Sequence, residues 1–324
     1  MELRLFIATI LLFISFAWCK PLIEEGTKPV KLGKSKFYGP ANSGQSNGPK
    51  IEDLSKTKGT SANKDEETEE NEEMEELKGP QTEEEEEAEE LAELNPKLFE
   101  GDLKLSKDEI EKLSKNTVSK KDTVAAAERR WPNARVPIII DQTFDDARKA
   151  VLIAALDQFN KKTCVRFVAK EDYDTDYIKF TVGEGCYSTS VGKSLLGGEQ
   201  EISIGEGCNY QGTVIHEMMH AIGFFHEHTR LDRDQYITVN WQNIEKGREA
   251  QFQKYAHGEG DYLNEPYDYD SVMQYPRDGF GVMVNGKRLA TLVPKDKPWR
   301  KIGQRDGFSQ VDLNQINKLY KCYV

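Results

Sequence analysis

Three of the five histidines in this chain stand close together, as His216, His220 and His226 in the pattern HExxHxxGxxH. A helix through the first part of the pattern would bring His216 and His220 onto one face, one turn apart. Gly223 is a residue type that accepts a positive φ and ends a helix, so the chain can turn and bring His226 to the same point. Three imidazoles directed at one point predict a tetrahedral Zn²⁺ site with its fourth position open.

An open fourth position distinguishes a catalytic zinc site from a structural one, which four protein ligands usually close. Bound zinc would lower the pKa of a water molecule to about 7, and Glu217 would take the proton as the water attacks a polarised carbonyl. Transfer of this proton to the departing amine would complete amide hydrolysis. The pattern therefore predicts a zinc peptide hydrolase. We expect His228 to lie behind the ligands or in solvent, and we assign no role to His257.

The formal net charge of -12 over 324 residues conceals an acidic part and a balanced part. Residues 65–93 hold 17 acidic side chains against one basic residue, Lys78, whereas residues 122–324 hold 29 acidic and 26 basic ones. Neither part has the excess of Lys and Arg that a nucleic-acid-binding surface requires, so we expect no nucleic-acid partner. The run Glu83–Glu87 is interpreted as solvated charge in preference to a calcium-binding or matrix-binding tail.

The first 19 residues have the order of a secretory signal peptide. One basic residue, Arg4, precedes an apolar run from Leu5 to Trp18, and the spacing of small residues suits cleavage before Lys20. A membrane anchor is the alternative, but the run is short for a bilayer span, so we expect a secreted, extracellular protein without stable membrane association. Loss of Cys19 with the signal leaves four cysteines, which predict two disulfides in any of three pairings.

Composition divides the chain into a signal peptide at 1–19, a largely polar segment at 20–121 and a domain-sized part at 122–324. From residue 20 to about 90 the chain has too few apolar residues to offset the entropy of ordering, so this part is predicted to be disordered. Apolar residues then return and predict a short ordered piece around Phe99 to Asp102. Basic pairs that end at Lys121 and Arg130 could mark processing sites.

The domain begins near Trp131 with strand patterns, and its strongest helix pattern follows later, which predicts an α+β fold. Apolar positions at helical spacing predict a helix over residues 144–159. Runs rich in β-branched and aromatic residues predict four strands, at residues 136–140, 165–168, 178–182 and 201–204. The length suits one domain with a continuous core.

Residues 131–324 resemble the astacin family of metzincin metalloendopeptidases, and the match extends past the histidines. Glu227 follows the third histidine, and the motif Ser-Val-Met-Gln-Tyr that ends at Tyr275 is similar to the Met-turn of that family. The resemblance implies that Met273 forms an apolar floor beneath zinc. It also implies that Tyr275 can ligate zinc and swing away to stabilise the oxyanion. The family commonly has His where this chain has Gln274, a position that is not a ligand.

The resemblance also implies an architecture. Two lobes would flank an active-site cleft, with a twisted mixed sheet and long helices in the N-terminal lobe and an irregular C-terminal lobe. The implied disulfides are Cys164–Cys322 and Cys186–Cys208. The segment from Gly192 to Ile204 resembles the edge strand on which the family lays an extended substrate, although an ordinary hairpin fits these residues equally well.

The sequence FEGD from Phe99 to Asp102 is similar to the FxGD motif of astacin pro-segments. The resemblance implies that Asp102 replaces water on zinc until an activating protease cuts after Lys121 or Lys115, and that the new N-terminus is buried near Glu227. We therefore expect a secreted, monomeric zymogen of a zinc endopeptidase that acts on protein or peptide substrates. The alternatives are a catalytically silent scaffold and a glutamate-rich calcium-binding or matrix protein.

Overall fold

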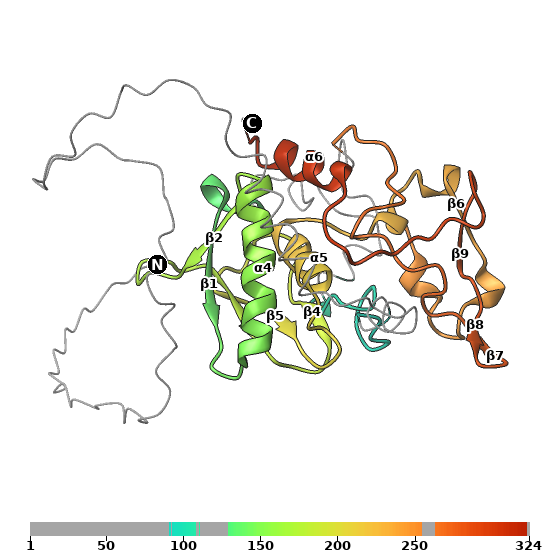
Figure 1. Ribbon diagram of the computed structural model, residues 1–324, viewed down its shortest axis with the longest axis horizontal. Helices are drawn as coiled ribbons and strands as arrows, with labels where there is room; N and C mark the ends of the chain where they lie inside the picture. The colour runs from blue at the N-terminus through green and yellow to red at the C-terminus, as the bar shows by residue number, and fades with distance from the viewer. Residues whose placement is uncertain (1–90, 92, 108–109, 111–128, 255–262, 323–324) are drawn as a thin grey trace, which may run out of the picture.

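The computed structural model describes residues 91, 93–107, 110, 129–254 and 263–322, which Figure 1 shows in colour. Five expectations lie outside these residues: the signal peptide, the disorder from residue 20 to about 90, the glutamate run, the cleavage sites Lys115 and Lys121, and the absence of a role for His257. Within the described part, no helix has the length and apolar character needed to cross a bilayer.

A five-stranded sheet forms the centre of the first half of the domain (Figure 1). Its strands are β1 (Arg135–Ile140), β2 (Arg166–Ala169), β3 (Tyr177–Thr181), β4 (Cys186–Ser188) and β5 (Glu199–Ile204). They lie in the order β2-β1-β3-β5-β4, and all neighbours are parallel except β4 and β5. The mixed sheet confirms the expected α+β class, and four of its strands overlap the four predicted ones.

The edge strand of this sheet next to the histidine pattern is β4. The expectation that the segment from Gly192 to Ile204 supplies this edge strand is therefore wrong. That segment contains β5, which lies between β3 and β4. β4 has three residues, too few for an alternating pattern to stand out in the sequence. Ser188 of β4 pairs in parallel with Leu103, and its N–H donates to the Asp102 carbonyl at 2.9 Å. The FEGD segment therefore extends the sheet.

Two helices pack beside each other against the sheet (Figure 1). Helix α4 (Asp146–Lys162) begins where the Asp145 carboxylate accepts from the N–H of Arg148 at 2.7 Å, and it buries Leu152 and Phe159 in the main core. Helix α5 (Gln211–Ile222) is buried at every position after its first. A helix that is buried all round lies inside a domain, which is where the histidine pattern is found.

The second half of the domain is irregular. Its strands are short: β6 (Ile237–Val239), β7 (Met283–Val284), β8 (Lys287–Arg288) and β9 (Leu292–Pro294). A second core packs Phe252, Tyr275 and Leu292 among them. The last helix, α6 (Gln310–Leu319), begins with a capping box between Ser309 and Asp312. The division into a sheet-containing half and an irregular half confirms the two expected lobes.

Both implied disulfides are present. Cys164–Cys322 spans 158 residues and ties the chain after α6 to the start of the β2 region, and Cys186–Cys208 joins β4 to the loop before α5. The second bond fixes the edge strand next to the helix that carries two of the histidines.

Candidate metal centre

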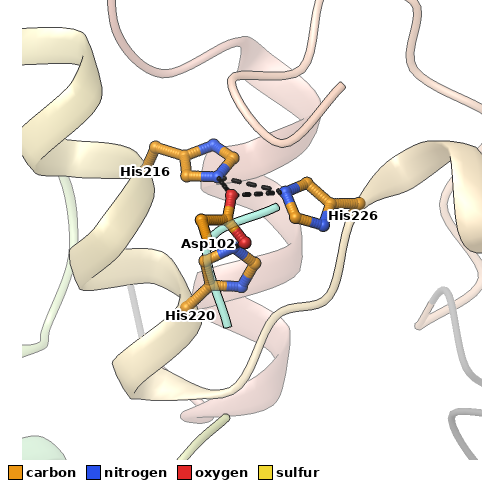
Figure 2. Close-up of side chains that lie close together, drawn as sticks. All are labelled: Asp102, His216, His220 and His226. Carbon is orange, nitrogen blue, oxygen red and sulfur yellow. Dashed lines mark hydrogen bonds and ion pairs between the residues drawn. The ribbon is translucent and has the colours of Figure 1, made fainter. Parts of the chain in front are cut away.

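Helix α5 places His216 and His220 one turn apart, and the chain beyond its end brings in His226 (Figure 2). Gly223 ends the helix with a φ of 123°, and its N–H donates to the carbonyls of Met219 and His220. All three rings are fully buried. The Nε2 atoms of His216 and His226 are 3.2 Å apart, so the rings converge on one point.

Each histidine uses its outer ring nitrogen, Nδ1, as a donor. The acceptors are the Val272 carbonyl for His216 at 2.7 Å, the Phe224 carbonyl for His220 at 2.6 Å and the Glu100 carboxylate for His226 at 2.7 Å. Such bonds fix the orientation of a ring and leave Nε2 as the nitrogen that can bind a metal. The three inner nitrogens could therefore hold a metal ion together.

Asp102 approaches the three histidines from the FEGD segment (Figure 2). Its Oδ2 lies 3.0 Å from Nε2 of His216 and 2.9 Å from Nε2 of His226, and its Oδ1 lies 3.4 Å from Nε2 of His220. Among the described residues, Asp102 Oδ1 and His220 Nε2 are within ion-pair distance of each other but neither makes a hydrogen bond, which is costly for buried polar atoms. A cation would satisfy both, and three imidazoles with one carboxylate are a donor set that tetrahedral zinc accepts.

The ionisable groups at this centre change one another's pKa values. Burial opposes ionisation of Asp102, but the charges of His226 and His220 outweigh it and lower the pKa of Asp102 well below its usual value. Burial lowers the pKa of His216 to about 4, so this ring is neutral, as a metal ligand must be. Against burial, Asp102 and Glu100 raise the pKa of His226 to about 9, so a proton and a metal ion compete for this ring.

Glu217 follows the first histidine on α5 and is fully buried. One of its carboxylate oxygens lies within 4.8 Å of ligand atoms of His216 and Glu93. Neither oxygen has a hydrogen-bond partner among the residues that the structure describes. Burial, and then the charges of Asp102 and Glu93, raise the pKa of Glu217 well above its usual value. A higher pKa makes the carboxylate a stronger base, which favours uptake of a proton.

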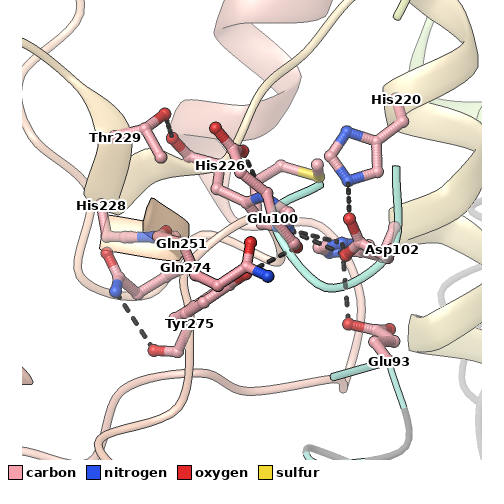
Figure 3. A network of polar contacts seen from close by, with 12 residues as sticks. Glu93, Glu100, Asp102, His220, His226, His228, Thr229, Gln251, Gln274 and Tyr275 are labelled. Carbon is pink, nitrogen blue, oxygen red and sulfur yellow. Dashed lines mark hydrogen bonds and ion pairs between the residues drawn. The ribbon is translucent and has the colours of Figure 1, made fainter. Parts of the chain in front are cut away.

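Met273 and Tyr275 lie on the segment that passes beside the histidines. Met273 is buried in the main core, and its carbonyl accepts from the N–H of Glu227 at 3.0 Å. The centroid of the Tyr275 ring lies 4.7 Å from that of His226, and its hydroxyl donates to the Glu100 carbonyl at 2.5 Å (Figure 3). The FEGD segment therefore holds this hydroxyl.

Other residues singled out in the sequence are buried around the centre. The carboxylate of Glu227 accepts from Arg230 at 2.7 Å, and burial raises its pKa to about 8. His228 does not reach solvent, because it is fully buried with its ring centroid 3.8 Å from that of Tyr275. Gln274 is a buried, hydrogen-bonded amide at the position where histidine is common in the family.

Sequence reasoning missed three charged residues here: Glu93, Glu100 and Arg305. Glu100 fills the variable position of FxGD, and burial raises its pKa while the hydrogen bond from His226 opposes the shift. Glu93 approaches the histidines with Glu100 (Figure 3) and binds Arg305. The sequence signal that pointed to this arrangement is the return of apolar residues around Phe99.

Comparison with known sequences decides the family. The peptidase family described as "Astacin" matches residues 123–321. The chain belongs to the astacin family. It is therefore a zinc metalloendopeptidase with Zn²⁺ as its cofactor, and the astacin fold accounts for the mixed sheet and the three converging histidines.

Relatives of this astacin include several zinc proteases. Zinc metalloproteinase nas-4 of Caenorhabditis elegans is 41% identical over 229 residues, which cover 69% of each chain. Meprin A subunit beta of Rattus norvegicus is 38% identical over 71% of this chain, but the match spans only 30% of the meprin subunit. The solved structure of High choriolytic enzyme 1, a hatching enzyme zinc-protease from Oryzias latipes, matches with a TM-score of 0.54 and 39% identity over 60% of this chain and 93% of that chain.

Proposed function

We propose that this astacin is a secreted endopeptidase made as a latent proenzyme, with a signal peptide at 1–19, a pro-segment at 20–121 and a peptidase domain at 122–324. The observation that carries the proposal is the contact of Asp102, in the proposed pro-segment, with all three histidines of the domain. A buried carboxylate at this point would serve as a zinc ligand and exclude the water that the reaction needs.

In this proposal His216, His220 and His226 bind zinc through Nε2, and Glu217 is the general base and acid. Zinc, when bound, acidifies water and polarises the scissile carbonyl. Glu217 takes the proton of the attacking water and returns it to the departing amine. Its raised pKa and its two buried oxygens without hydrogen-bond partners among the described residues support this role, because no other bond fixes the carboxylate.

Tyr275 stabilises the oxyanion through its hydroxyl, and Met273 supplies an apolar floor under the ligands. The contact between the rings of Tyr275 and His226 supports the first role, because it keeps the hydroxyl near the metal centre. In the latent form the hydroxyl is engaged with the Glu100 carbonyl. Release of the pro-segment frees this donor for the substrate.

The edge of β4 is the proposed place for an extended protein or peptide substrate. In the present structure the pro-segment occupies it, since the N–H of Lys104 donates to the Ser188 carbonyl at 2.9 Å and Ser188 donates to the Asp102 carbonyl at the same distance. When the pro-segment leaves, the same backbone groups can pair with a substrate strand.

An activating protease removes the pro-segment by cutting after Lys121 or Lys115. The new N-terminus then reaches Glu227, whose raised pKa supports this step: Arg230 and the N–H of Asp268 together do not offset the burial of its carboxylate. Secretion is supported by the apolar sequence at 1–19 and by the two disulfides, which form in oxidising compartments. We propose a monomer without stable membrane association.

Replacement of Glu217 by Ala in the secreted and processed protein tests the assignment of Glu217 as general base and acid. Zinc content is expected to match that of the wild type, while peptide hydrolysis falls by at least about 10²–10⁴-fold. Glu249→Ala changes an exposed glutamate and is the matched control that keeps activity. A chelator is expected to stop hydrolysis by the wild type and by the control. Undiminished hydrolysis by zinc-loaded Glu217→Ala would overturn the assignment.

A further inference from the structure

Glu100 stands at the variable position of FxGD, yet its side chain is fully buried against the metal centre. Its Oε2 accepts the hydrogen bond from Nδ1 of His226 at 2.7 Å (Figure 3), and its Oε1 has no partner among the described residues. A carboxylate is costly to bury without compensation. The ring of His226 is therefore the partner that accounts for the position of this side chain.

His226 differs from the other two histidines in the source of its partner. His216 and His220 donate to carbonyl oxygens of Val272 and Phe224, which belong to the proposed peptidase domain. His226 donates to a carboxylate of the pro-segment itself. Hydrogen bonds to carboxylates are stronger than those to carbonyls, and a metal-bound imidazole becomes a more basic ligand when its outer N–H makes one.

Two contacts of the FEGD segment hold Glu100 in place. Its carbonyl accepts from the hydroxyl of Tyr275, and two residues further on Asp102 meets the histidines. Glu100 itself has a φ of 46°, a left-handed conformation that is unfavourable for a non-glycine residue. In this conformation the two acidic side chains bracket one ring, with Glu100 at Nδ1 and Asp102 at Nε2 of His226.

We propose that Glu100 is a positioning residue that orients His226 and strengthens it as a zinc ligand, so that the proenzyme holds zinc more tightly than the processed enzyme does. The proposal rests on the proposed function, in which His226 is a ligand. The pro-segment then acts on zinc twice, directly through Asp102 and through Glu100 by way of His226. Zinc is retained in the latent form, and processing makes it easier to remove.

Zinc affinity of the uncleaved full chain tests this proposal. Competition with a fluorescent zinc chelator compares the wild type with Glu100→Ala and Glu100→Gln. Glu100→Ala is expected to weaken zinc binding by about 10–100-fold, the usual effect of losing the outer partner of a ligand. Glu100→Gln is expected to lose less, because an amide oxygen still accepts but carries no charge. Leu94→Ala, which removes an apolar contact of the same segment with the second core, controls for general loosening.

NMR spectroscopy distinguishes loss of the hydrogen bond between Glu100 and His226 from a general loosening of the pro-segment. In zinc-loaded protein with ¹⁵N-labelled histidine, the Nδ1 proton of His226 is expected downfield of those of His216 and His220, because only it is donated to a carboxylate. Glu100→Gln is expected to move this single resonance upfield and to leave the other two in place. Leu94→Ala is expected to move none of them.

Wild-type zinc affinity and an unmoved His226 resonance in both Glu100 variants would overturn the proposal. A loss of affinity in Glu100→Ala no larger than that in Leu94→Ala would overturn it as well. Zinc binding by His226→Ala distinguishes a failure of the role of Glu100 from a failure of the proposed function. If His226→Ala binds zinc as tightly as the wild type, the proposed ligand set is wrong. If it loses zinc while the Glu100 variants keep it, only the role of Glu100 fails.

Discussion

The carboxylate of Glu93 and the guanidinium of Arg305 form a buried ion pair beside the metal centre, although 212 residues separate them in the sequence. Arg305 donates through Nε to both carboxylate oxygens, at 3.0 and 2.9 Å, and through a terminal nitrogen at 2.5 Å. Oε2 of Glu93, which accepts from the terminal nitrogen of Arg305, also lies 3.6 Å from Nε2 of His216. The proposed pro-segment therefore brings a third carboxylate to the histidines, after Asp102 and Glu100, and Arg305 compensates its charge.

Glu93→Ala in the uncleaved full chain is expected to weaken latency. Arg305 keeps its hydrogen bonds to backbone carbonyls, but its buried charge loses the Glu93 carboxylate, and breaking a buried ion pair costs about 3–5 kcal/mol. Since about 1.4 kcal/mol changes an equilibrium constant by a factor of ten, the population with an open cleft should increase on the order of 100-fold or more. Hydrolysis of a short fluorogenic peptide by the uncleaved chain measures this increase.

Lys97→Ala changes an exposed residue of the same segment and is expected to remain as latent as the wild type. Asp102→Ala removes the proposed ligand itself and sets the upper limit of activity without cleavage. If Glu93→Ala and the wild type hydrolyse the peptide equally slowly, with gels showing intact chains, the ion pair does not contribute to latency.

The histidine cluster is predictable from sequence because its geometry is local. The helical period places His216 and His220, and Gly223 turns the chain toward His226, so no distant part of the molecule is needed. The cysteine count predicts two disulfides, but the pairing of Cys164 with Cys322, 158 residues away, follows only from the family resemblance.

Contacts between residues far apart in sequence are not predictable in this way. Glu93 ends an acidic stretch, and nothing in that pattern shows that Arg305, from a distant loop, buries and compensates it. Glu100 and His226 are 126 residues apart, and the position of Glu100 in FxGD shows no preference for burial. The edge strand that contains Ser188 is recognisable only once the order of the whole sheet is known.

Tyr275→Phe is expected to lower the kcat of the processed enzyme by about 10²–10³-fold with little change in KM. The reason is that the hydroxyl is the proposed donor to the oxyanion, an interaction made in the transition state and absent from the ground state. Steady-state kinetics with a peptide substrate measures the effect, and zinc analysis confirms that the ligands are intact. A kcat within about twofold of the wild type would contradict the role proposed for Tyr275.

Asp312 supports the segment beside the histidines from helix α6. Its buried carboxylate accepts from the Ser271 hydroxyl at 2.6 Å and from the N–H groups of Val272 and Ser309 at 3.0 and 2.9 Å. Val272 in turn provides the carbonyl that orients the first histidine. Burial raises the pKa of Asp312 from 3.8 to about 6 despite these donors, and the nearby charge of Asp268 adds to the shift.

The folded protein therefore binds this proton more tightly than the unfolded chain does. The resulting stabilisation is complete below about pH 4 and is lost as the pH rises through about 6. The difference between these two pKa values corresponds to about 3 kcal/mol. The unfolding free energy of the wild type minus that of Asp312→Asn is expected to fall by up to this amount between about pH 4 and pH 7. Urea unfolding of both proteins under non-reducing conditions measures it, and a difference that stays constant would count against the assignment.

Gly212 lies where helix α5 passes the backbone of Arg305. A Cβ at this position would lie 1.5 Å from the Arg305 carbonyl oxygen and 2.2 Å from its carbonyl carbon. Alanine is favoured over glycine in a helix by about 1 kcal/mol, but an overlap with backbone atoms cannot be relieved by turning a side chain. Gly212→Ala is therefore expected to destabilise the protein by about 3 kcal/mol and to displace Arg305 from Glu93.

Gly286→Ala is the matched control, because no atom lies within 4 Å of the position its Cβ would take, and its φ of 78° costs alanine only about 1–2 kcal/mol. Urea unfolding of the two variants and the wild type measures stability. Peptide hydrolysis by the uncleaved chains is expected to rise in Gly212→Ala, where the displaced Arg305 no longer compensates Glu93, and to stay at the wild-type level in Gly286→Ala. A Gly212→Ala chain as stable and as latent as the wild type would show that α5 and Arg305 do not depend on this close approach.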